Sequence, residues 1–475
     1  MHSDDSPAKF TPVKSLKSHP SIPSSSAFKT WQSQLSDFAD EFINAVCQDT
    51  GRSYEESYLY DWLPIESTFD FLRDNLAEFA EPKFSETAMP WILGRRDIQK
   101  RRIPLGKVLI VGTWNFPLSL HLNQILFSIA AGNQVTFKGS PFATTVTKVF
   151  EKHLPKIFGE DKFTVWHAEN EEVIKSLEDG EYQGLIFTGG SSAAKIYAKA
   201  CAQSFTKCIL EASGSEPALI HPSACNSDKK RNDLVDHLLW GLLHFTGQTC
   251  VAPRFWLVPR DEAEKIWKEI QSVLENDPKL FSERAPLRHD GVKQEYGAWC
   301  DWALALPHSE AYEPNAEHPA KFFYVKNLSD LPANSPSSFG PGAIIAAYDE
   351  WDDAVHWINA SPWSLMPQCY YDSLSQEEWN SLQKIRATSI SLGESIVAVG
   401  DAGLPFGGQR QSGTGITHGM EGLEELSQIQ CFVEVETRPG LGKYTRPTWT
   451  NLKNLHKQVP LLKNVKKNPL TALFK

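Results

Sequence analysis

The chain has 475 residues, of which 41% are hydrophobic, and a formal net charge of −11. This length predicts two or three domains with well-filled cores, and the acidic balance argues against a nucleic acid or an anionic membrane as the main partner. The eight cysteines include no C-x-x-C pair, so we expect no metal site and no disulfide framework. Without an evident secretory signal or a long apolar run, the sequence favours a cytoplasmic protein that has no transmembrane segment.

Two helical patterns follow a Ser-, Pro- and Lys-rich arm that covers residues 1 to about 26. From Phe28 to Val46, apolar residues recur at alternating steps of three and four. This stripe predicts a helix with one apolar face, ended near Thr50-Gly51, and we expect the face to pack against the next domain. The second pattern runs from Phe69 to Phe79.

From Lys107 onwards, short apolar strands alternate with helices. In chain order we expect a strand at 108–111, a helix at 118–131, a strand at 135–137, a helix at 143–154, a strand at 163–165, a helix at 172–177 and a strand at 185–187. This alternation predicts parallel βαβ units and a doubly wound sheet, with ligands at the carboxyl ends of its strands. After Pro217 the pattern starts again, with a helix over 234–245 and a strand over 255–258.

Three segments carry candidate chemistry. The segment Gly247-Gln248-Thr249-Cys250 offers a thiol nucleophile, and Glu211-Ala212-Ser213-Gly214 offers a carboxylate on a Gly/Ser-rich turn. The segment Thr113-Trp114-Asn115-Phe116-Pro117 offers an amide side chain that can hold an oxyanion. In this order, the three segments resemble the active site of the aldehyde dehydrogenase superfamily, and the resemblance extends from about Arg95 to about Phe432.

The resemblance implies an α/β fold like that of aldehyde dehydrogenases: a doubly wound parallel-sheet cofactor domain, a second α/β catalytic domain and a small oligomerisation element. We expect residues 1–216 to hold the N-terminal helices and the cofactor domain, and 217–404 the catalytic domain. Residues 405–475 would form a C-terminal return segment with the oligomerisation element and a basic tail. Beyond Glu436 this tail contains no acidic residue, and we expect a solvated extension rather than a specific anion site.

The same resemblance assigns the catalytic roles. Cys250 would attack an aldehyde, which requires a thiol pKa below the free value of about 8.5. Asn115, helped by the backbone N–H of Cys250, would hold the oxyanion, and Glu211 would activate water. The alternatives are a buried structural thiol for Cys250, an acid paired with Lys207 for Glu211, and an amide that closes the turn before Pro117 for Asn115.

The resemblance also implies that NAD or NADP binds, although the G-x-G-x-x-G fingerprint is absent. Lys138 and Ser140 match the strand that normally ends in Lys-Pro-Ser-Glu, and Lys138 would lie by the adenosine ribose. Gly189 and Gly190 match the turn that places the pyrophosphate at a helix N-terminus. The remaining expected cofactor-binding residues are Thr113, Trp114 and Phe339.

Several family positions differ in this chain. The glutamate that follows Lys-Pro-Ser and binds the adenosine ribose falls on Pro141, and the glutamate ahead of Phe-Gly-Pro, which usually binds the nicotinamide ribose, falls on Ser337. The second glycine of the pyrophosphate turn falls on Ala194, and the asparagine that precedes Pro-Phe-Gly-Gly falls on Gly393. Loss of both carboxylates predicts weak NAD binding, and loss of the one at Pro141 removes a charge that would repel a 2′-phosphate.

The C-terminal signature is present as Pro405-Phe406-Gly407-Gly408 with His418-Gly419. Its His-Gly pair is typical of the shorter, class 3-like branch that acts on fatty and aromatic aldehydes. By the same resemblance, four residues would lie near the substrate funnel: Phe116, His121, Asn123 and Phe245.

The leading interpretation is NAD(P)-dependent oxidation of a small-molecule aldehyde to a carboxylic acid, through a thiohemiacetal and a thioester on Cys250. An acyl-thioester reductase on the same scaffold is the first alternative, and Glu211 argues against it because such enzymes typically lack the hydrolytic glutamate. A binding or structural protein with weak turnover is the second alternative, which the two missing carboxylates favour. Family members are usually dimers or tetramers, so we expect a homodimer or homotetramer.

Overall fold

The computed structural model describes residues 16–86, 96–276, 285–314 and 319–435. The chain divides into two compact units, of which the larger comprises residues 20–79 and 104–428 and the smaller comprises 1–19, 80–103 and 429–475. The basic tail and most of the N-terminal arm predicted from the sequence lie outside the described residues. Within the described part, no helix is both long and apolar enough to cross a membrane.

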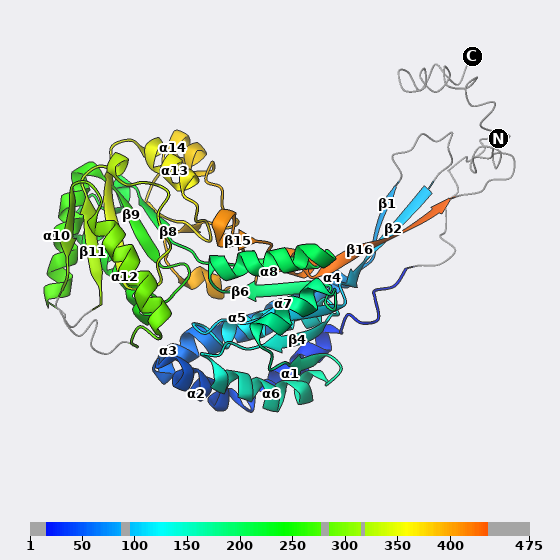
Figure 1. Cartoon of the computed structure of the whole chain (residues 1–475). Coiled ribbons are helices and arrows are strands. Elements are labelled where there is room, and N and C mark those ends of the chain that lie inside the picture. Colours follow the sequence, from blue (N-terminus) through cyan, green and yellow to red (C-terminus); the bar gives the residue numbers. More distant parts are fainter. Residues whose placement is uncertain (1–15, 87–95, 277–284, 315–318, 436–475) are drawn as a thin grey trace, which may run out of the picture. The chain divides into compact units, whose positions relative to one another are not determined.

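A six-stranded sheet forms the first half of the larger unit (Figure 1). Its order is β15-β7-β6-β3-β4-β5, and every neighbouring pair is parallel except β15 with β7. The strands are β3 (Lys107–Val111), β4 (Gln134–Lys138), β5 (Phe163–Val165), β6 (Gly184–Thr188), β7 (Lys207–Glu211) and β15 (Gly413–Thr414). The predicted doubly wound parallel sheet is therefore confirmed.

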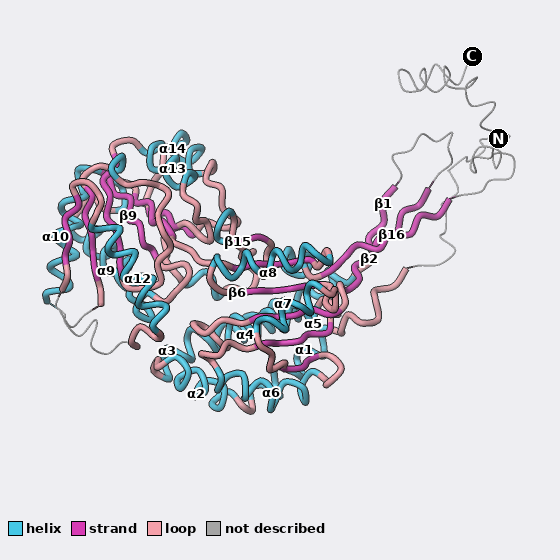
Figure 2. The backbone as a smooth tube through the Cα atoms, in the orientation of Figure 1, coloured by secondary structure: helices cyan, strands magenta, loops and turns pink. Residues whose placement is uncertain are grey.

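Helices cover both faces of this sheet (Figure 2), because successive strand residues alternate between two cores. Val108 and Ile110 belong to the core that includes the N-terminal helices, whereas Leu109 and Val111 belong to the opposite one. The helices on the first face are α1 (Ser25–Ser36), α2 (Ala39–Thr50), α4 (Leu63–Ala80), α5 (Ser119–Ala130) and α6 (Thr144–Phe158); those on the second are α7 (Asn170–Glu178) and α8 (Ser191–Ser204).

The apolar stripe near the N-terminus forms two helices where the sequence predicted one. α1 ends at Ser36, whose Oγ donates to the carbonyl of Gln32 at 2.8 Å, and such bonds compete with the helical ladder. α2 ends at Thr50, as predicted, and its C-cap residue Gly51 has a left-handed φ of 75°. A short helix, α3 (Tyr54–Ser57), and a π-helical turn, η1 (Tyr58–Trp62), then lead into α4.

A seven-stranded sheet forms the second half of the larger unit, in the order β10-β11-β12-β9-β8-β13-β14. Only β10 and β11 pair antiparallel. The strands are β8 (Glu216–Ile220), β9 (Pro253–Pro259), β10 (Ser309–Tyr312), β11 (Lys321–Val325), β12 (Gly342–Tyr348), β13 (Gln368–Tyr370) and β14 (Ser391–Leu392). The predicted second α/β domain thus has its own parallel-rich sheet.

The helices of this half also cover two faces. α9 (Asp228–Leu243) and α10 (Arg260–Asn276) pack with Trp256 and Val258, whereas α12 (Asp290–Leu304), α13 (Trp351–Ala360) and α14 (Gln376–Leu382) pack with Phe255 and Leu257. Shorter elements are η3 (Pro222–Ala224), η4 (His244–Gly247), η5 (Leu328–Asp330), η6 (Val397–Gly400), η7 (Arg410–Ser412) and α15 (Gly419–Glu425). The predicted boundary at residue 217 stays a prediction; β7 ends in the first sheet and β8 begins in the second.

The smaller unit contains a three-stranded sheet in the order β1-β2-β16. Its strands are β1 (Lys83–Glu86), β2 (Arg96–Pro104) and β16 (Ser427–Val435). β1 and β2 pair antiparallel. These strands were not among the elements predicted from the sequence.

Candidate active site

Cys250 lines two cavities in the larger unit. The first, the apolar cavity, has a volume of about 570 Å³, and the second, the sheet-end cavity, has about 490 Å³. The sheet-end cavity is lined by the residues that end β3, β4, β6 and β7: Val111, Lys138, Thr188 and Glu211. A ligand cavity at the carboxyl ends of the parallel strands is what the sequence predicted.

Every catalytic and cofactor-binding residue predicted from the sequence lines the sheet-end cavity. The candidate catalytic residues there are Cys250, Glu211 and Asn115, and the candidate cofactor-binding residues are Thr113, Trp114, Lys138, Ser140, Gly189, Gly190 and Phe339. Segments that lie more than 130 residues apart in the chain are thus brought to one cavity. Their individual roles stay predictions.

The backbone that leads to Cys250 is tightly constrained. Phe245, Thr246 and Gly247 have positive φ values of 47°, 55° and 70°, a conformation that a non-glycine residue adopts only when its surroundings enforce it. A Cβ on Gly247 would lie 2.2 Å from the carbonyl oxygen of Gly340. The buried guanidinium of Arg254 donates to the carbonyls of Gly247 and Gly340, at 2.6 and 2.5 Å. These two hydrogen bonds hold the Gly247 and Gly340 segments together.

The pKa of Cys250 differs from the expectation. Burial, and to a smaller extent the carboxylates of Glu211 and Glu216, together raise the pKa of this thiol to about 12. The predicted lowering below 8.5 is therefore wrong for the protein alone, because burial and two nearby carboxylates both disfavour the thiolate. The thiol is protonated at neutral pH, and its attack on a carbonyl requires a base.

The turn that carries Glu211 touches the nucleophile loop directly. A Cβ on Gly214 would lie 2.4 Å from the carbonyl oxygen of Cys250 and 3.0 Å from Oε1 of Glu216. Only glycine permits so close a backbone approach. The glycine of the Glu-Ala-Ser-Gly segment therefore brings the turn of Glu211 against Cys250.

Glu211 is buried at the end of β7 and is held by two hydroxyl groups. Thr417 Oγ1 donates to Oε1 at 2.5 Å, and Thr188 Oγ1 donates to Oε2 at 3.4 Å. Burial nevertheless raises the pKa of this carboxyl to about 7, a value suited to a general base at neutral pH. The alternative pairing with Lys207 is wrong, because Lys207 pairs with Glu425 at 2.6 Å.

Two other acids near Cys250 in sequence or space differ from Glu211. Glu216 accepts the backbone N–H groups of Leu365 and Met366, both at 2.9 Å, and lines neither cavity. Its role is to join two segments of the second half. Glu394 lines the apolar cavity but not the sheet-end cavity that Glu211 and Asn115 share.

Asn115 faces the nucleophile loop. Its Nδ2 donates to the carbonyl of Gln248 at 3.3 Å, so its amide bonds across the site rather than closing its own turn. The turn is fixed by His121 from α5, whose Nε2 accepts from the Thr113 N–H at 2.8 Å while Nδ1–H donates to the Pro117 carbonyl at 2.7 Å. Burial lowers the pKa of His121 to about 4, which keeps the ring neutral and this tautomer in place.

A buried ion pair supports the same turn from the N-terminal helices. Arg52 pairs with Asp61, and its Nη2 also donates to the Asn115 carbonyl at 3.4 Å. Asp61 accepts from the backbone N–H of Ser119 at 3.0 Å. The guanidinium carbon of Arg52 lies 4.7 Å from the ring centre of Phe116. Loss of either charge would leave the other buried and unpaired beside Asn115.

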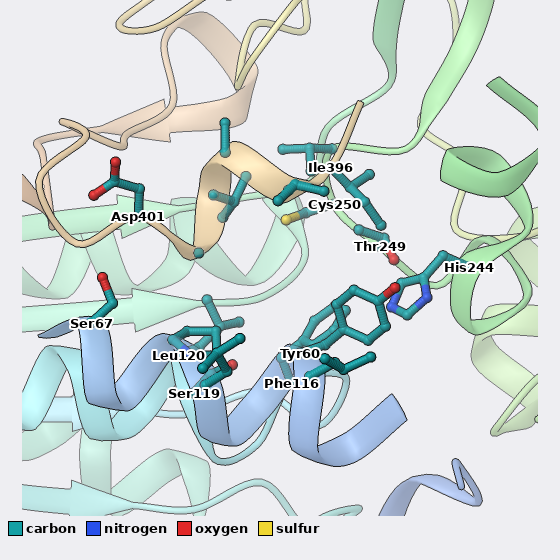
Figure 3. A pocket seen from close by; sticks show the side chains of 18 of the residues that line it. Tyr60, Ser67, Phe116, Ser119, Leu120, His244, Thr249, Cys250, Ile396 and Asp401 are labelled. Atoms are coloured by element: carbon teal, nitrogen blue, oxygen red, sulfur yellow. The ribbon is translucent and has the colours of Figure 1, made fainter. Parts of the chain in front are cut away.

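The apolar cavity extends from Cys250 along η1, α4 and η6. Its apolar lining residues are Leu59, Leu63, Pro64, Phe116, Leu120, Trp240, Val251, Ile396, Val397, Ala398 and Val399. Figure 3 shows Tyr60, Phe116 and His244 gathered at one end, and Ser67 and Asp401 at the other. Of the four residues expected near the substrate funnel, Phe116 and Asn123 line this cavity. His121 and Phe245 do not line it, because His121 holds the turn of Asn115 and Phe245 is buried in the strained loop.

The sheet-end cavity has features that fit a dinucleotide. Gly190 caps the N-terminus of α8, and a Cβ added there would meet nothing within 4 Å, so the helix N-terminus opens into the cavity as phosphate binding requires. Lys138 supplies a cation whose pKa is lowered by burial. Pro141 lines the cavity where the family carries a glutamate. Among the described residues, no cluster of three His, Cys, Asp or Glu side chains is suited to a metal ion.

Sequence reasoning missed several residues that line or support the site. Thr188 and Thr417 hold Glu211, and His289, Val292 and Glu295 line the sheet-end cavity from the start of α12. No motif marks α12. The one signal in the sequence was Ser337, which stands where the family carries a glutamate; it predicted weak NAD binding and did not point to α12.

A parallel sheet whose carboxyl ends open on a nucleotide-sized cavity, joined to a second α/β half, is the architecture of a nucleotide-dependent dehydrogenase. The model of the aldehyde dehydrogenase family matches residues 13–279 and 325–432. The chain belongs to this family. It is an oxidoreductase that uses NAD or NADP.

Relatives and solved structures agree with this assignment. Aldehyde dehydrogenase family 3 member A2 of Rattus norvegicus is 24% identical over 456 residues, which cover 91% of this chain and 89% of the relative. Fatty aldehyde dehydrogenase HFD1 of Saccharomyces cerevisiae is 27% identical, over 80% of this chain and 73% of the relative. Succinic semialdehyde dehydrogenase of Streptococcus pyogenes, solved with NADP+, shares the fold with a TM-score of 0.75 at 19% identity, over 87% of this chain and 90% of that one. The class 3-like resemblance is confirmed, and neither alternative function gains support.

Proposed function

We propose that the chain oxidises a long, apolar aldehyde to its carboxylic acid with NAD or NADP, through a thioester on Cys250. The observation that carries this proposal is the position of Cys250 at the junction of two cavities. The apolar cavity suits the hydrocarbon part of an aldehyde, and the sheet-end cavity suits the cofactor. A carbonyl carbon beside the thiol would then lie between them.

Addition of the thiol to the aldehyde is the first step. The Cys250 sulfur forms a bond to the carbonyl carbon, and the thiol proton leaves to Glu211, directly or through one water molecule. Glu211 suits this role because burial raises its pKa to about 7. The side-chain amide of Asn115 and the backbone N–H of Cys250 donate to the oxyanion that forms.

Oxidation and hydrolysis follow. When bound, NAD or NADP would supply the acceptor for a hydride from the former aldehyde carbon. The product on Cys250 is a thioester. Glu211 then passes the thiol proton to solvent and, ionised again, takes a proton from the water that attacks the thioester. The C–S bond breaks, the acid leaves, and the thiol regains a proton. The residues proposed to hold the cofactor are Thr113, Trp114, Lys138, Ser140, Gly189, Gly190 and Phe339.

A homodimer or homotetramer is part of the proposal. Within the smaller unit, β1 and β16 expose four large apolar side chains: Phe84, Ile429, Phe432 and Val433. Exposed apolar groups of this size on one short sheet are typical of an interaction surface. Light scattering on the purified protein measures the oligomer number. The cytoplasmic location expected from the composition stays a prediction.

The test uses aldehydes of increasing chain length and the variant Cys250→Ser. Because each buried methylene contributes about 0.8 kcal/mol, kcat/KM should rise about fourfold per methylene until the apolar cavity is filled. Cys250→Ser should lower NAD(P)H formation by orders of magnitude, since a hydroxyl forms no thioester. Cys431→Ser, at an exposed thiol, is the control and should retain activity. Preference for a short charged aldehyde, or turnover by Cys250→Ser, would refute the proposal.

A further inference from the structure

We propose that Glu295 of α12 binds the diol of the ribose at the nicotinamide end of the cofactor, in place of the carboxylate that the family carries at position 337. This residue takes the role only if the sheet-end cavity holds the dinucleotide, so the assignment rests on the proposed function. Glu295 would thereby make the contact with the nicotinamide ribose that the family's glutamate makes from position 337. The restored carboxylate comes from a different element of the fold.

Glu295 lies on the wall of the sheet-end cavity, together with Phe339 and Cys250. Three further residues from the start of the same element, His289, Gly291 and Val292, also line the cavity. The N-terminal part of α12 therefore forms one wall of the site. Glu295 is the acid on this wall.

The side chain of Glu295 is tied to the position where the family's glutamate would stand. Ser337 Oγ donates to Glu295 Oε1 at 2.7 Å. The short serine leaves space at position 337, and the longer side chain from α12 reaches it. The serine at 337 and the glutamate at 295 complement each other, because a glutamate at 337 would place a second negative charge against Glu295.

The carboxylate of Glu295 has acceptor capacity to spare. Within the part of the chain that the structure describes, Ser337 is its hydrogen-bond donor, and its charge also acts on Arg254 and His289. A carboxylate offers about four lone-pair sites, so sites remain for further donors from the cavity. The two neighbouring hydroxyl groups of one ribose can both donate hydrogen bonds to the same carboxylate.

The position of Glu295 selects one ribose of the dinucleotide. Lys138 and Ser140 lie at the end of β4, and Gly190 opens the N-terminus of α8, which suits the phosphates. Glu295 instead contacts the segment of Phe339, on the half of the larger unit that carries Cys250. A negative side chain would repel phosphates, so it fits the ribose next to the reacting ring.

A role confined to helix stability does not account for Glu295. It is the sixth residue of α12, beyond the first turn in which an acid interacts with the helix dipole. Its contact is with Ser337, 42 residues away in the chain, and not with a neighbour on the helix.

A contact with the nicotinamide ribose can be distinguished from a contact that selects between NAD and NADP. NAD and NADP differ only by a phosphate on the adenosine ribose, and both carry a free diol on the nicotinamide ribose. Loss of the Glu295 carboxylate should therefore weaken both cofactors by the same factor. AMP lacks the nicotinamide ribose and should not respond.

The experiment titrates the full-length protein with NAD, NADP and AMP and follows tryptophan fluorescence, since Trp114 lines the cavity. Glu295→Gln should weaken NAD and NADP by about ten- to a hundredfold, as expected when hydrogen bonds to a charged group are lost. AMP affinity should stay unchanged. Asp301→Asn, at an exposed acid farther along α12, is the matched control and should bind all three ligands as the wild type does.

Two further variants make the outcome decisive. Ser337→Ala, which keeps the carboxylate but removes its donor, should weaken both cofactors severalfold and equally. Glu295→Gln with Ser337→Glu returns a carboxylate to position 337 and should recover most of the lost affinity. Unchanged cofactor binding in Glu295→Gln, unequal losses for NAD and NADP, or an equal loss for AMP would each overturn the inference. If the wild type binds none of the three ligands, the proposed function itself fails.

Discussion

Glu211 is the residue whose substitution tests the mechanism most directly. Its carboxyl pKa is raised to about 7 by burial, whereas the thiol pKa of Cys250 is raised to about 12. At pH 7.5 the free thiolate would then amount to about one part in 30,000. In the proposed mechanism the thiol therefore loses its proton to a base as it attacks, and Glu211 is the carboxylate with the largest electrostatic effect on it.

Glu211→Gln removes this base without removing the oxygen that accepts from Thr417. A general base contributes about 10²- to 10⁴-fold, which is about 3 to 5 kcal/mol of activation free energy. We expect the first-turnover burst of NAD(P)H to slow by at least about a hundredfold at pH 7.5. Part of the loss is offset, because the substitution also removes a negative charge that raises the thiol pKa.

The pH dependence of the burst gives a second signature. In the wild type, the burst rate should rise as the pH increases through about 7, where Glu211 ionises, and should then level off. In Glu211→Gln it should continue to rise about tenfold per pH unit, because only the thiolate then reacts. Stopped-flow absorbance with an apolar aldehyde measures both profiles, and intact mass identifies any acyl-enzyme that accumulates.

The outcomes separate three roles for Glu211. A burst of wild-type rate followed by a stalled acyl-enzyme would refute the early role and leave Glu211 as the base for hydrolysis alone. Full turnover would refute both chemical roles. Glu394→Gln is the matched control, since Glu394 lines the apolar cavity beside Cys250, and it should behave as the wild type.

Two further predictions concern cofactor choice and stability. Pro141→Glu places a carboxylate in the sheet-end cavity, and this charge would repel the 2′-phosphate, so the ratio of NADP to NAD affinity should fall. An unchanged ratio in parallel titrations would show that position 141 does not contact the adenosine ribose. Burial raises the pKa of Glu211 to about 7, so the native state binds the proton more tightly than the unfolded state, and stability is full below the ordinary glutamate pKa and falls as the pH rises through about 7. Glu211→Gln escapes this loss, so the stability of the variant relative to the wild type should rise between pH 5 and pH 8, by up to about 3 kcal/mol in unfolding free energy. Thermal midpoints of both proteins over this range measure the change, and a difference that stays constant with pH would contradict the raised pKa.

The sequence was sufficient for the fold class and for many of the residues that line the sheet-end cavity. Strand residues such as Val108 to Val111 read as buried because both faces of a parallel sheet are covered, and the helices between them follow from local periodicity. The segments of Cys250, Glu211 and Asn115 were identifiable because together, and in this order, they resemble the active-site motifs of the aldehyde dehydrogenase superfamily. The single helix expected from Phe28 to Val46 was wrong, since periodicity alone does not register the break after Ser36.

The electrostatics of the site depended on the tertiary structure. The pKa of Cys250 is set by burial and by Glu211 and Glu216, which approach it from other segments. The residues next to Cys250 in the sequence therefore do not determine this pKa. The link from Ser337 to Glu295 joins a loop to α12, so the sequence revealed the missing carboxylate but not its replacement. The sequence thus determined which groups are present and which turns carry them. Distances between segments far apart in the chain decided their protonation and their partners, because Coulomb and desolvation energies depend on position in space and not on order along the chain.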